Sequence, residues 1–327
     1  MKILVRLPNW LGDMVMAAAF LRALQEAYPG AEISVIAKKG IHGLLPLFPG
    51  ISHQHVFSKD AYRGFMGLLR FGRKVRRGGP FDLFFCLPDS FSSALMGYAT
   101  GAKNRIGFKK EGRSFLLTHS YSKPQRGHRV EEYVSLLELY TGKKAAPPQV
   151  LLQHTYAQKD HIAVNINSEA SSRRLTVPKA VEVIGLLRES VTAPLVLIGG
   201  PGEKAFVEEV YEKLPRKDGI TSAAGRTALP QLAELLASAR LLLTTDSGPA
   251  HLANALGTPT VVLFGAGNEA NTAPYNSGLR TIIRLGQLSC EPCLKNKCPL
   301  YEVPQCLQQL ESRLIVDRVK QSMANKQ

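Results

Sequence analysis

The sequence predicts an α/β protein made of two doubly wound domains, each built around a parallel β-sheet. Short apolar runs of strand length alternate with helical segments from residue 2 onward, which is typical of βαβ units. The same plan starts again after residues 141–148, a segment with the Gly, Lys, Ala and Pro composition of a linker. With 327 residues, the chain has the length of two ordinary domains, which we place at 1–155 and 156–327.

The first half shows the alternation from its first residues. We expect strands at 2–7, 32–37, 82–87 and 104–108, and helices at 14–28 and 129–140. Pro29 and Gly30 close the first helix, because neither residue continues a helix well. The second helix has one apolar face, made of Val130, Tyr133, Leu136, Leu137 and Tyr140.

The second half repeats the plan, with strands expected at 161–166, 194–198, 241–243 and 261–264, and helices from 178, at 229–238 and at 304–323. Between the last two strands, Asp246, Ser247 and Gly248 have turn chemistry, and Pro249 suits the first turn of a helix that Gly257 ends. The final helix is a candidate for packing back on the first domain. Ligands of parallel sheets bind beyond the carboxyl ends of the strands, so we expect function in a cleft between the two domains.

Composition excludes several classes of protein. Hydrophobic residues make up 45% of the chain, so cores can form without disulfides or metal. No apolar run has the length needed to span a bilayer. Asn9, Gly12 and Asp13 interrupt any signal-peptide core near the N-terminus, so we expect a cytoplasmic protein.

The net charge of +15 lies mostly in the first half. Residues 1–155 hold 22 Lys and Arg against 10 Asp and Glu, while residues 156–327 hold 19 against 16. Such a surplus favours an acidic partner: nucleic acid, an anionic membrane or a phosphorylated substrate, with solubility as the alternative. Two tracts, 61–77 and 103–129, carry most of it. A basic amphipathic helix there either lies on anionic lipid or packs on the sheet.

Four of the five cysteines form a cluster with the spacing Cys290-x2-Cys293-x4-Cys298-x7-Cys306. That spacing is compatible with structural zinc, but it is not a standard paired-knuckle pattern. Free or buried thiols are the favoured state in a reducing cytoplasm, and no metal is expected. Cys86 lies in an apolar run and is expected in the core.

The loop at residues 6–13 follows the first strand and points to the expected cleft. It has neither a dinucleotide fingerprint nor a P-loop. Asp13 is its only carboxylate. A carboxylate at a helix start is held ionised by the helix dipole and can accept a proton from a substrate hydroxyl. The alternative is that Asp13 only caps a helix that begins at Met14.

Two polar loops of the second half suit an anion. Free amides at the helix start after residue 245 lie beside a Ser hydroxyl and a His, although Asp246 or Ser247 could be only an N-cap and His251 only a surface histidine. Residues 168–174 combine hydroxyls and amides with two guanidinium groups, which suits a diphosphate. The alternative there is a solvated polar loop.

Several strings together resemble a known family. Residues 246–252 (Asp-Ser-Gly-Pro-Ala-His-Leu) resemble the nucleotide-sugar signature of the ADP-heptose:lipopolysaccharide heptosyltransferases, glycosyltransferase family 9. Residues 9–13 (Asn-Trp-Leu-Gly-Asp), 128–133 and the cysteine cluster are similar to other parts of that family. The resemblance implies a GT-B fold of two facing Rossmann-like domains, inversion of the anomeric centre, no required cofactor or metal, and Asp13 as general base.

The resemblance also implies site residues. In the family, a Lys-Arg-Trp-Pro string binds the donor phosphates through its first basic residue; here residues 173–178 read Arg-Arg-Leu-Thr-Val-Pro, so the aromatic is missing. The residues implied for the ADP-heptose donor are Ser168, Arg173, Arg174, Gly225, Thr227, Asp246, Ser247, Gly248 and His251. Those proposed for the acceptor, in the basic first half, are Asn9, Trp10, Gly12, Arg63, Arg105, Lys109 and Arg113.

The resemblance implies transfer of heptose from ADP-L-glycero-D-manno-heptose to the phosphorylated heptosyl-Kdo2-lipid A core at the inner leaflet. We expect a cytoplasmic monomer, with peripheral membrane association as a further expectation and no nucleic-acid partner. One alternative is a related transferase with another lipopolysaccharide acceptor or a protein acceptor. The other is a non-catalytic binder of a nucleotide sugar or of nucleic acid, although no recognised nucleic-acid module is present.

Overall fold

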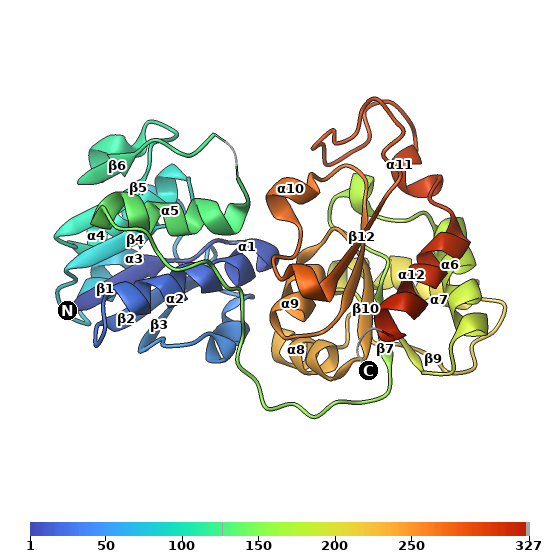
Figure 1. Cartoon of the computed structure of the whole chain (residues 1–327). Helices are drawn as coiled ribbons and strands as arrows, with labels where there is room; N and C mark the ends of the chain where they lie inside the picture. Colours follow the sequence, from blue (N-terminus) through green and yellow to red (C-terminus); the bar gives the residue numbers. More distant parts are fainter. Residues whose placement is uncertain (126, 325–327) are drawn as a thin grey trace. The chain divides into compact units, whose positions relative to one another are not determined.

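The computed structural model of the chain describes residues 1–125 and 127–324. The chain divides into two compact units, Met1–Gln153 and His154–Gln327. Each unit contains one six-stranded sheet in which all neighbouring strands are parallel (Figure 1). The predicted fold class, α/β with two doubly wound parallel sheets, is confirmed. Among the helices of the described residues, none is long and apolar enough to cross a bilayer.

The first unit has the strand order β3-β2-β1-β4-β5-β6. The strands are β1 (Lys2–Arg6), β2 (Glu32–Lys38), β3 (His53–Phe57), β4 (Leu83–Cys86), β5 (Asn104–Phe108) and β6 (His119–Tyr121). Its helices are α1 (Leu11–Met16), α2 (Ala18–Ala27), α3 (Gly64–Arg76), α4 (Phe91–Thr100) and α5 (Arg129–Thr141). α2 packs on α5, and α3 packs on α4. Because right-handed crossovers that run in opposite directions place helices on opposite faces, these two pairs cover the two faces of the sheet.

Two predictions for this unit differ from the structure. One helix is predicted at 14–28, but the structure has two: α1 begins earlier, at Leu11, and ends at Met16, and α2 begins at Ala18 after the single residue Ala17. The strands β3 and β6 are not predicted at all, because they are edge strands without apolar runs. In β3, His53, Gln54 and His55 leave little hydrophobic signal.

The second unit has the strand order β12-β11-β10-β7-β8-β9, which is the same winding. Its strands are β7 (Ile162–Asn165), β8 (Leu195–Leu197), β9 (Ile220–Ser222), β10 (Leu241–Thr245), β11 (Thr260–Phe264) and β12 (Arg280–Arg284). The helices are α6 (Val177–Ser190), α7 (Lys204–Glu212), α8 (Leu229–Ser238), α9 (Gly248–Ala255), α10 (Glu269–Thr272), α11 (Gln305–Gln308) and α12 (Ser312–Ala324). The single final helix predicted at 304–323 is therefore two helices, of which α12 packs on α6 and on β10, β11 and β12 of its own unit.

The burial of the central strands explains why their sequences are continuous apolar runs. All five residues of β10 and of β11 are buried, because helices cover both faces of the sheet. In each unit the winding direction reverses between two neighbouring strands: β1 and β4 in the first unit, β7 and β10 in the second. Open parallel sheets bind ligands beyond the carboxyl ends of the strands at such switch points.

Candidate functional site

Asp13 lies beyond β1, at the switch point of the first unit, but it does not cap α1. The helix begins at Leu11, and Trp10 occupies the N-cap position in an extended conformation with no side-chain capping bond. The interpretation of Asp13 as an N-cap is therefore wrong, because the helix starts three residues before Met14. Its carboxylate remains available for other contacts.

Two side chains of α5 hold this carboxylate. The Tyr133 hydroxyl donates to Asp13 Oδ1 at 3.4 Å, and Arg129 Nε lies 3.9 Å from the same oxygen. Arg129 and Tyr133 are four residues apart, so they lie on one face of the helix. The start of α5 is fixed by a reciprocal cap, in which His128 Nδ1 accepts from the amide of Val130 and Glu131 accepts from the amide of His128.

The surroundings of Asp13 act on its pKa in opposite directions. Burial raises the pKa of the Asp13 carboxyl, while the Arg129 guanidinium and the Tyr133 hydroxyl hydrogen bond lower it. The side chain keeps 29% of its surface exposed. Asp13 thus combines a raised pKa with access to solvent, as a general base requires.

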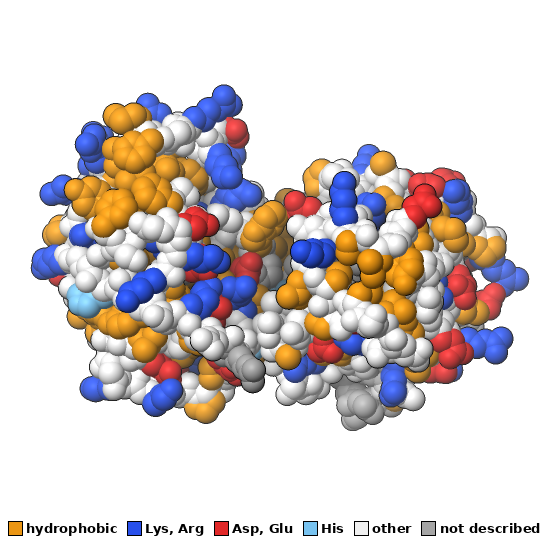
Figure 2. Space-filling view, turned by 90° about the horizontal axis from the view of Figure 1, so that it is seen from above, with side chains coloured by type: hydrophobic (Ala, Val, Ile, Leu, Met, Phe, Trp, Pro, Cys, Tyr) orange, Lys and Arg blue, Asp and Glu red, His pale blue; other side chains and the backbone are white. Residues whose placement is uncertain are grey.

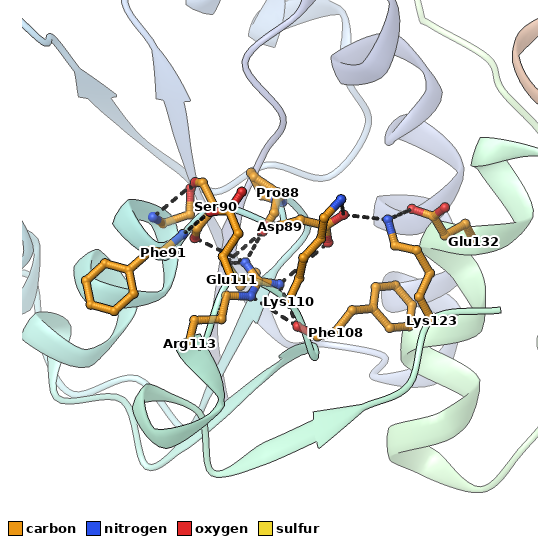
Figure 3. A network of polar contacts seen from close by, with 12 residues as sticks. Pro88, Asp89, Ser90, Phe91, Phe108, Lys110, Glu111, Arg113, Lys123 and Glu132 are labelled. Carbon is orange, nitrogen blue, oxygen red and sulfur yellow. Dashed lines mark hydrogen bonds and ion pairs between the residues drawn. The ribbon is translucent and has the colours of Figure 1, made fainter. Parts of the chain in front are cut away.

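A chain of ion pairs links Asp13 to the loop after β4. Figure 3 shows the part of this chain that runs from Glu132 through Lys123 to Asp89. Arg129 also pairs with Glu132 at 2.9 Å, and Lys123 lies 2.8 Å from Glu132 and 2.5 Å from Asp89. Asp89 follows β4 directly, so charged side chains connect the two loops of the first switch point. The sequence does not reveal this network, because its members come from four separate segments.

Two of the arginines proposed for the acceptor do not fit that role. Arg113 is 0% exposed and donates to the carbonyls of Phe108, Pro88 and Ser90, so it holds its own loop in place (Figure 3). Arg105 lies near the amino end of β5, where it donates to the carbonyls of Leu116 and Ala102. That end of the sheet is opposite the loop of Asp13. Both assignments are wrong, because sequence does not show whether backbone carbonyls occupy a guanidinium.

The other candidate acceptor residues lie at the carboxyl edge of the first sheet. Asn9 accepts from the buried Arg6, and Trp10 is 60% exposed with Lys38 Nζ 5.7 Å from its ring. Gly12 lies in the first turn of α1. Lys109 directly follows β5 and Arg63 precedes α3, and both side chains are exposed.

In the second unit, the start of α9 is left without a side-chain cap. Ser247 occupies the N-cap position, but its hydroxyl donates to the carbonyl of Thr245 and accepts from Asn165 at 2.8 Å. His251 is buried rather than on the surface. The interpretation of the Asp246 and Ser247 side chains as caps and the surface interpretation of His251 are therefore wrong. Pro249 has no amide hydrogen and the amide of Ala250 donates to the carbonyl of Ser247 at 3.1 Å, so the amide that the first turn offers to a ligand is that of Gly248.

A buried polar network beneath this helix start was missed by sequence reasoning. Asn165 donates to Thr244 at 3.0 Å, Asn167 donates to Asn165 at 2.7 Å, and Thr245 donates to the carbonyl of Asn167 at 2.6 Å. The available signal is polar residues at the ends of two apolar strands: Asn165 ends β7, and Thr244 and Thr245 end β10. These bonds fix the geometry of both loops at the second switch point.

The two adjacent arginines of the loop after β7 have different environments. Arg173 Nη1 lies 3.1 Å from Asp246 Oδ2, whereas the Arg174 guanidinium lies 4.7 Å from the centre of the Phe206 ring. Burial raises the pKa of Asp246, and the positive charges of Arg173 and Arg284 oppose this rise. Arg173 is thus brought to the helix start, while Arg174 stacks on α7.

The remaining donor candidates lie at the same edge of the second sheet. Ser168 is buried in the loop after β7, and Gly248 begins α9. Gly225 and Thr227 follow β9, two strands away from β7. Gly225 has a φ of 68° and donates its amide to the carbonyl of Gly199 at 2.8 Å, so it forms a tight turn at this edge.

The segment of the cysteine cluster contacts the loop after β7. Cys290, Cys293, Cys298 and Cys306 line one cavity of about 20 Å³, and burial raises the pKa of Cys306 to about 11. Within the described ranges, no three His, Cys, Asp or Glu side chains are placed to share a metal ion. Ser172, next to Arg173, donates to the carbonyl of Lys295 at 2.5 Å, so the cluster's segment braces that loop. Cys86 is buried in the core, as predicted.

Two doubly wound parallel sheets in one chain, each with polar side chains at its switch point, define the GT-B class of fold. The sequence profile of glycosyltransferase family 9 (heptosyltransferase) matches residues 68–303. The chain belongs to this family and is a glycosyltransferase.

Named relatives agree with this family. Lipooligosaccharide heptosyltransferase 2 of Campylobacter jejuni is 23% identical over 98% of both chains. Lipopolysaccharide heptosyltransferase 2 of Salmonella typhimurium is 28% identical over 86% of this chain and 88% of its own. The solved structure of ADP-heptose lipopolysaccharide heptosyltransferase II of E. coli covers 100% of this chain and 99% of its own, with a TM-score of 0.84 and 24% identity.

Proposed function

We propose that this chain transfers heptose from ADP-L-glycero-D-manno-heptose to the heptosyl-Kdo2-lipid A inner core of lipopolysaccharide, with inversion of the anomeric centre. Family membership and the names of the relatives support the donor sugar and the class of acceptor. The observation that carries the chemistry is the environment of Asp13, a carboxylate that caps nothing and keeps part of its surface in solvent.

The second unit binds the donor in this proposal. Arg173 and the amide of Gly248 at the start of α9 contact the diphosphate, since the guanidinium and the positive end of the helix dipole lie at one switch point. Ser247 and Asp246 orient the donor beside them, and His251 lies one turn into the same helix. When the bond between the anomeric carbon and the diphosphate breaks, the departing ADP takes the electron pair, and these groups stabilise its charge.

The first unit binds the acceptor and supplies the base. Asp13 accepts the proton of the acceptor hydroxyl as that oxygen attacks the anomeric carbon from the face opposite ADP, so the configuration inverts. Asn9, Trp10 and Gly12 flank the carboxylate, and the exposed Lys109 suits the phosphates of the core. Arg173 and the amino end of α9 supply the positive charge for the leaving group, so we propose that transfer requires no metal ion.

The test is a product assay by mass spectrometry with ADP-heptose and a panel of truncated lipid A cores, run in the presence of a chelator. We expect Asp13→Asn to lower kcat by about 10²- to 10⁴-fold, the range for loss of a general base. ADP binding, measured by calorimetry, should stay unchanged. Glu26→Gln, which changes an exposed carboxylate paired with Arg22 on α2, is the matched control.

Each outcome bears on one part of the proposal. Near-normal turnover by Asp13→Asn refutes the base assignment. Transfer only to a core that lacks the first heptose, to an outer-core sugar or to a protein refutes the acceptor assignment. Loss of transfer in the chelator, restored by a metal ion, refutes the metal-free mechanism. Absence of transfer to every acceptor refutes the proposed donor.

A further inference from the structure

Large apolar side chains of the first unit lie exposed at two points, and a half-buried aromatic side chain lies beside one of them. Phe65 and Met66, in the first turn of α3, are 56% and 68% exposed. Phe115 is 73% exposed in the 3₁₀ turn η2 (Arg113–Leu116), and Phe91 at the start of α4 is half-buried beside it. We call Phe65, Met66, Phe91 and Phe115 the apolar edge.

The apolar edge rests on a small core of its own. The rings of Phe91 and Phe115 lie 6.1 Å apart. Phe91 packs with Leu68 and Leu69 of α3 against the buried cluster of Ala94, Leu95, Leu116 and Leu117. Phe65 precedes Leu68 and Leu69 by three and four residues, so it lies on the same helix face one turn earlier. Figure 2 shows hydrophobic side chains gathered on the first unit, with Lys and Arg around them.

The exposure is not a by-product of poor packing of α3. The rest of this helix buries one face, made of Gly67, Phe71, Gly72 and Val75, while the basic side chains on its other face are exposed. Only the first turn extends beyond its contacts. The two alternatives expected for the basic helix therefore apply to different parts of it. The body of α3 packs on the protein, whereas its first turn keeps two apolar side chains in solvent.

Cations border the apolar edge. Arg63 immediately precedes α3 with 81% of its side chain exposed, and Lys109 and Lys110 are exposed in the loop that leads to η2. Lys59, next to Asp60, is a fourth exposed cation. The acidic groups in these segments are three: Asp60, exposed and 3.9 Å from Arg63; Asp89, 3.7 Å from Lys110; and Glu111, which accepts from the amide of Phe91. Cations therefore outnumber carboxylates around the apolar side chains.

The position of the apolar edge follows from the topology. α3, α4 and η2 follow the carboxyl ends of β3, β4 and β5, and α1 with Asp13 follows the carboxyl end of β1. Since all of these strands are parallel, the starts of α3 and α4, with Phe65, Met66 and Phe91, lie at the same edge of the sheet as Asp13 and the exposed Trp10. Phe115 joins this edge through its contact with Phe91. A partner bound to the apolar edge would therefore lie at the side of the sheet that carries Asp13, the candidate base.

We propose that the apolar edge docks on an anionic lipid bilayer. Aromatic and Met side chains that insert into the interface, bordered by Lys and Arg that meet anionic headgroups, form the combination by which proteins lie on membranes. This inference rests on the proposed function in one respect, because a lipid-anchored acceptor in that bilayer would reach the edge of the sheet where Asp13 lies.

The experiment uses the full-length protein and sedimentation with vesicles. One set contains phosphatidylethanolamine and phosphatidylglycerol, and the other contains phosphatidylcholine alone. We expect the wild type to bind the anionic vesicles, less tightly as salt is added, and the neutral vesicles only weakly. The variant that combines Phe65→Ser with Phe115→Ser should bind anionic vesicles at least about tenfold more weakly, since two apolar anchors are lost.

The control is Leu314→Ser, which removes an apolar side chain that is 40% exposed on α12 of the second unit. It should bind vesicles as the wild type does, and a thermal melt shows whether each variant is folded. Failure of the wild type to bind anionic vesicles, or equal binding by the folded double variant, overturns the proposal. Vesicle-independent self-association that the double variant abolishes, without vesicle binding, also overturns it in favour of a protein interface.

Activity separates this inference from the proposed function. With a lipid-embedded acceptor, the double variant should lose turnover, whereas with a water-soluble deacylated acceptor it should match the wild type. Equal loss on both acceptors contradicts a docking role. No transfer by the wild type to either acceptor refutes the proposed function, while the vesicle result still decides the docking inference.

Discussion

Asp13 shows how much of one residue's chemistry depends on neighbours that are remote in sequence. The motif at residues 9–13 singles it out, but its contacts with Arg129 and Tyr133 come from a helix more than a hundred residues away. Arg129 is shared between Asp13 and Glu132, so its charge only partly offsets the burial of the Asp13 carboxyl.

Arg129→Gln should shift the pH dependence of turnover. The guanidinium lowers the pKa of Asp13, so its loss raises that pKa further, and a larger fraction of Asp13 is protonated at a given pH. The acidic limb of kcat/KM should therefore move to higher pH, with the plateau at high pH less affected. Tyr133→Phe removes a hydrogen bond to the same carboxylate and should move the limb in the same direction.

The pH profile is measured with the soluble acceptor. Arg22→Gln, which changes an arginine paired with Glu26 on α2, is the control and should leave the limb in place. A limb that stays unchanged or moves to lower pH in Arg129→Gln would contradict the role of this arginine in holding Asp13 ionised.

Arg173 and Arg174 provide a comparison between adjacent residues. Arg173→Ala should weaken ADP binding by about 10- to 100-fold, the effect of losing hydrogen bonds to a charged group. Arg174→Ala should have little effect, because its guanidinium stacks on Phe206. Calorimetry with ADP measures both. Equal losses of ADP affinity in the two variants, or a larger loss in Arg174→Ala, would contradict the assignment of the diphosphate contact to Arg173.

Packing between elements decides how closely α3 approaches α4. A side chain at Gly72 would place its Cβ 2.5 Å from Ala99 Cβ and 2.7 Å from the carbonyl oxygen of Met96. The glycine is thus required for the close approach of the two helices, which together carry most of the apolar edge. The sequence shows only that Gly72 lies in a helical segment, where glycine is unfavourable.

Gly72→Ala should lower the free energy of unfolding by about 1–3 kcal/mol, the cost of overpacking a core. Gly185→Ala in α6 is the matched control, because a Cβ there meets nothing within 4 Å. This control should stabilise the protein by about 0.5–1 kcal/mol, since alanine favours a helix over glycine. Urea unfolding measures both, and effects of the same sign would contradict the packing argument.

At the scale of the whole molecule, charge separates the two halves of the chain. Residues 1–155 carry 22 Lys and Arg against 10 Asp and Glu, and residues 156–327 carry 19 against 16. If the first unit binds the phosphorylated acceptor, long-range attraction contributes more to acceptor binding than to donor binding.

Added salt should therefore raise the KM for the acceptor more steeply than the KM for ADP-heptose. The Debye length falls from about 10 Å at 0.1 M to about 3 Å at 1 M, so salt screens dispersed surface charges more than the close contacts of Arg173. A dephosphorylated acceptor serves as the control and should show a shallower salt dependence. Equal slopes for donor and phosphorylated acceptor would contradict this division of charge.

The sequence by itself determined the α/β class, the repeated winding and the segments after the strands in which Asp13, Arg173 and Asp246 lie. Buried parallel strands leave continuous apolar runs, and turn residues punctuate them, so this information is local in the chain. It also located the charge surplus, because counting residues requires no coordinates.

Only the tertiary structure decided which charged side chains are free. Arg113 and Arg105 look like acceptor ligands in sequence, yet backbone carbonyls hold both. The Asp13–Arg129–Tyr133 contacts, the different environments of Arg173 and Arg174, and the exposed start of α3 were equally beyond the sequence. Each of these features depends on which segments, distant in sequence, come into contact. Long-range packing decides those contacts, and local secondary-structure propensity does not.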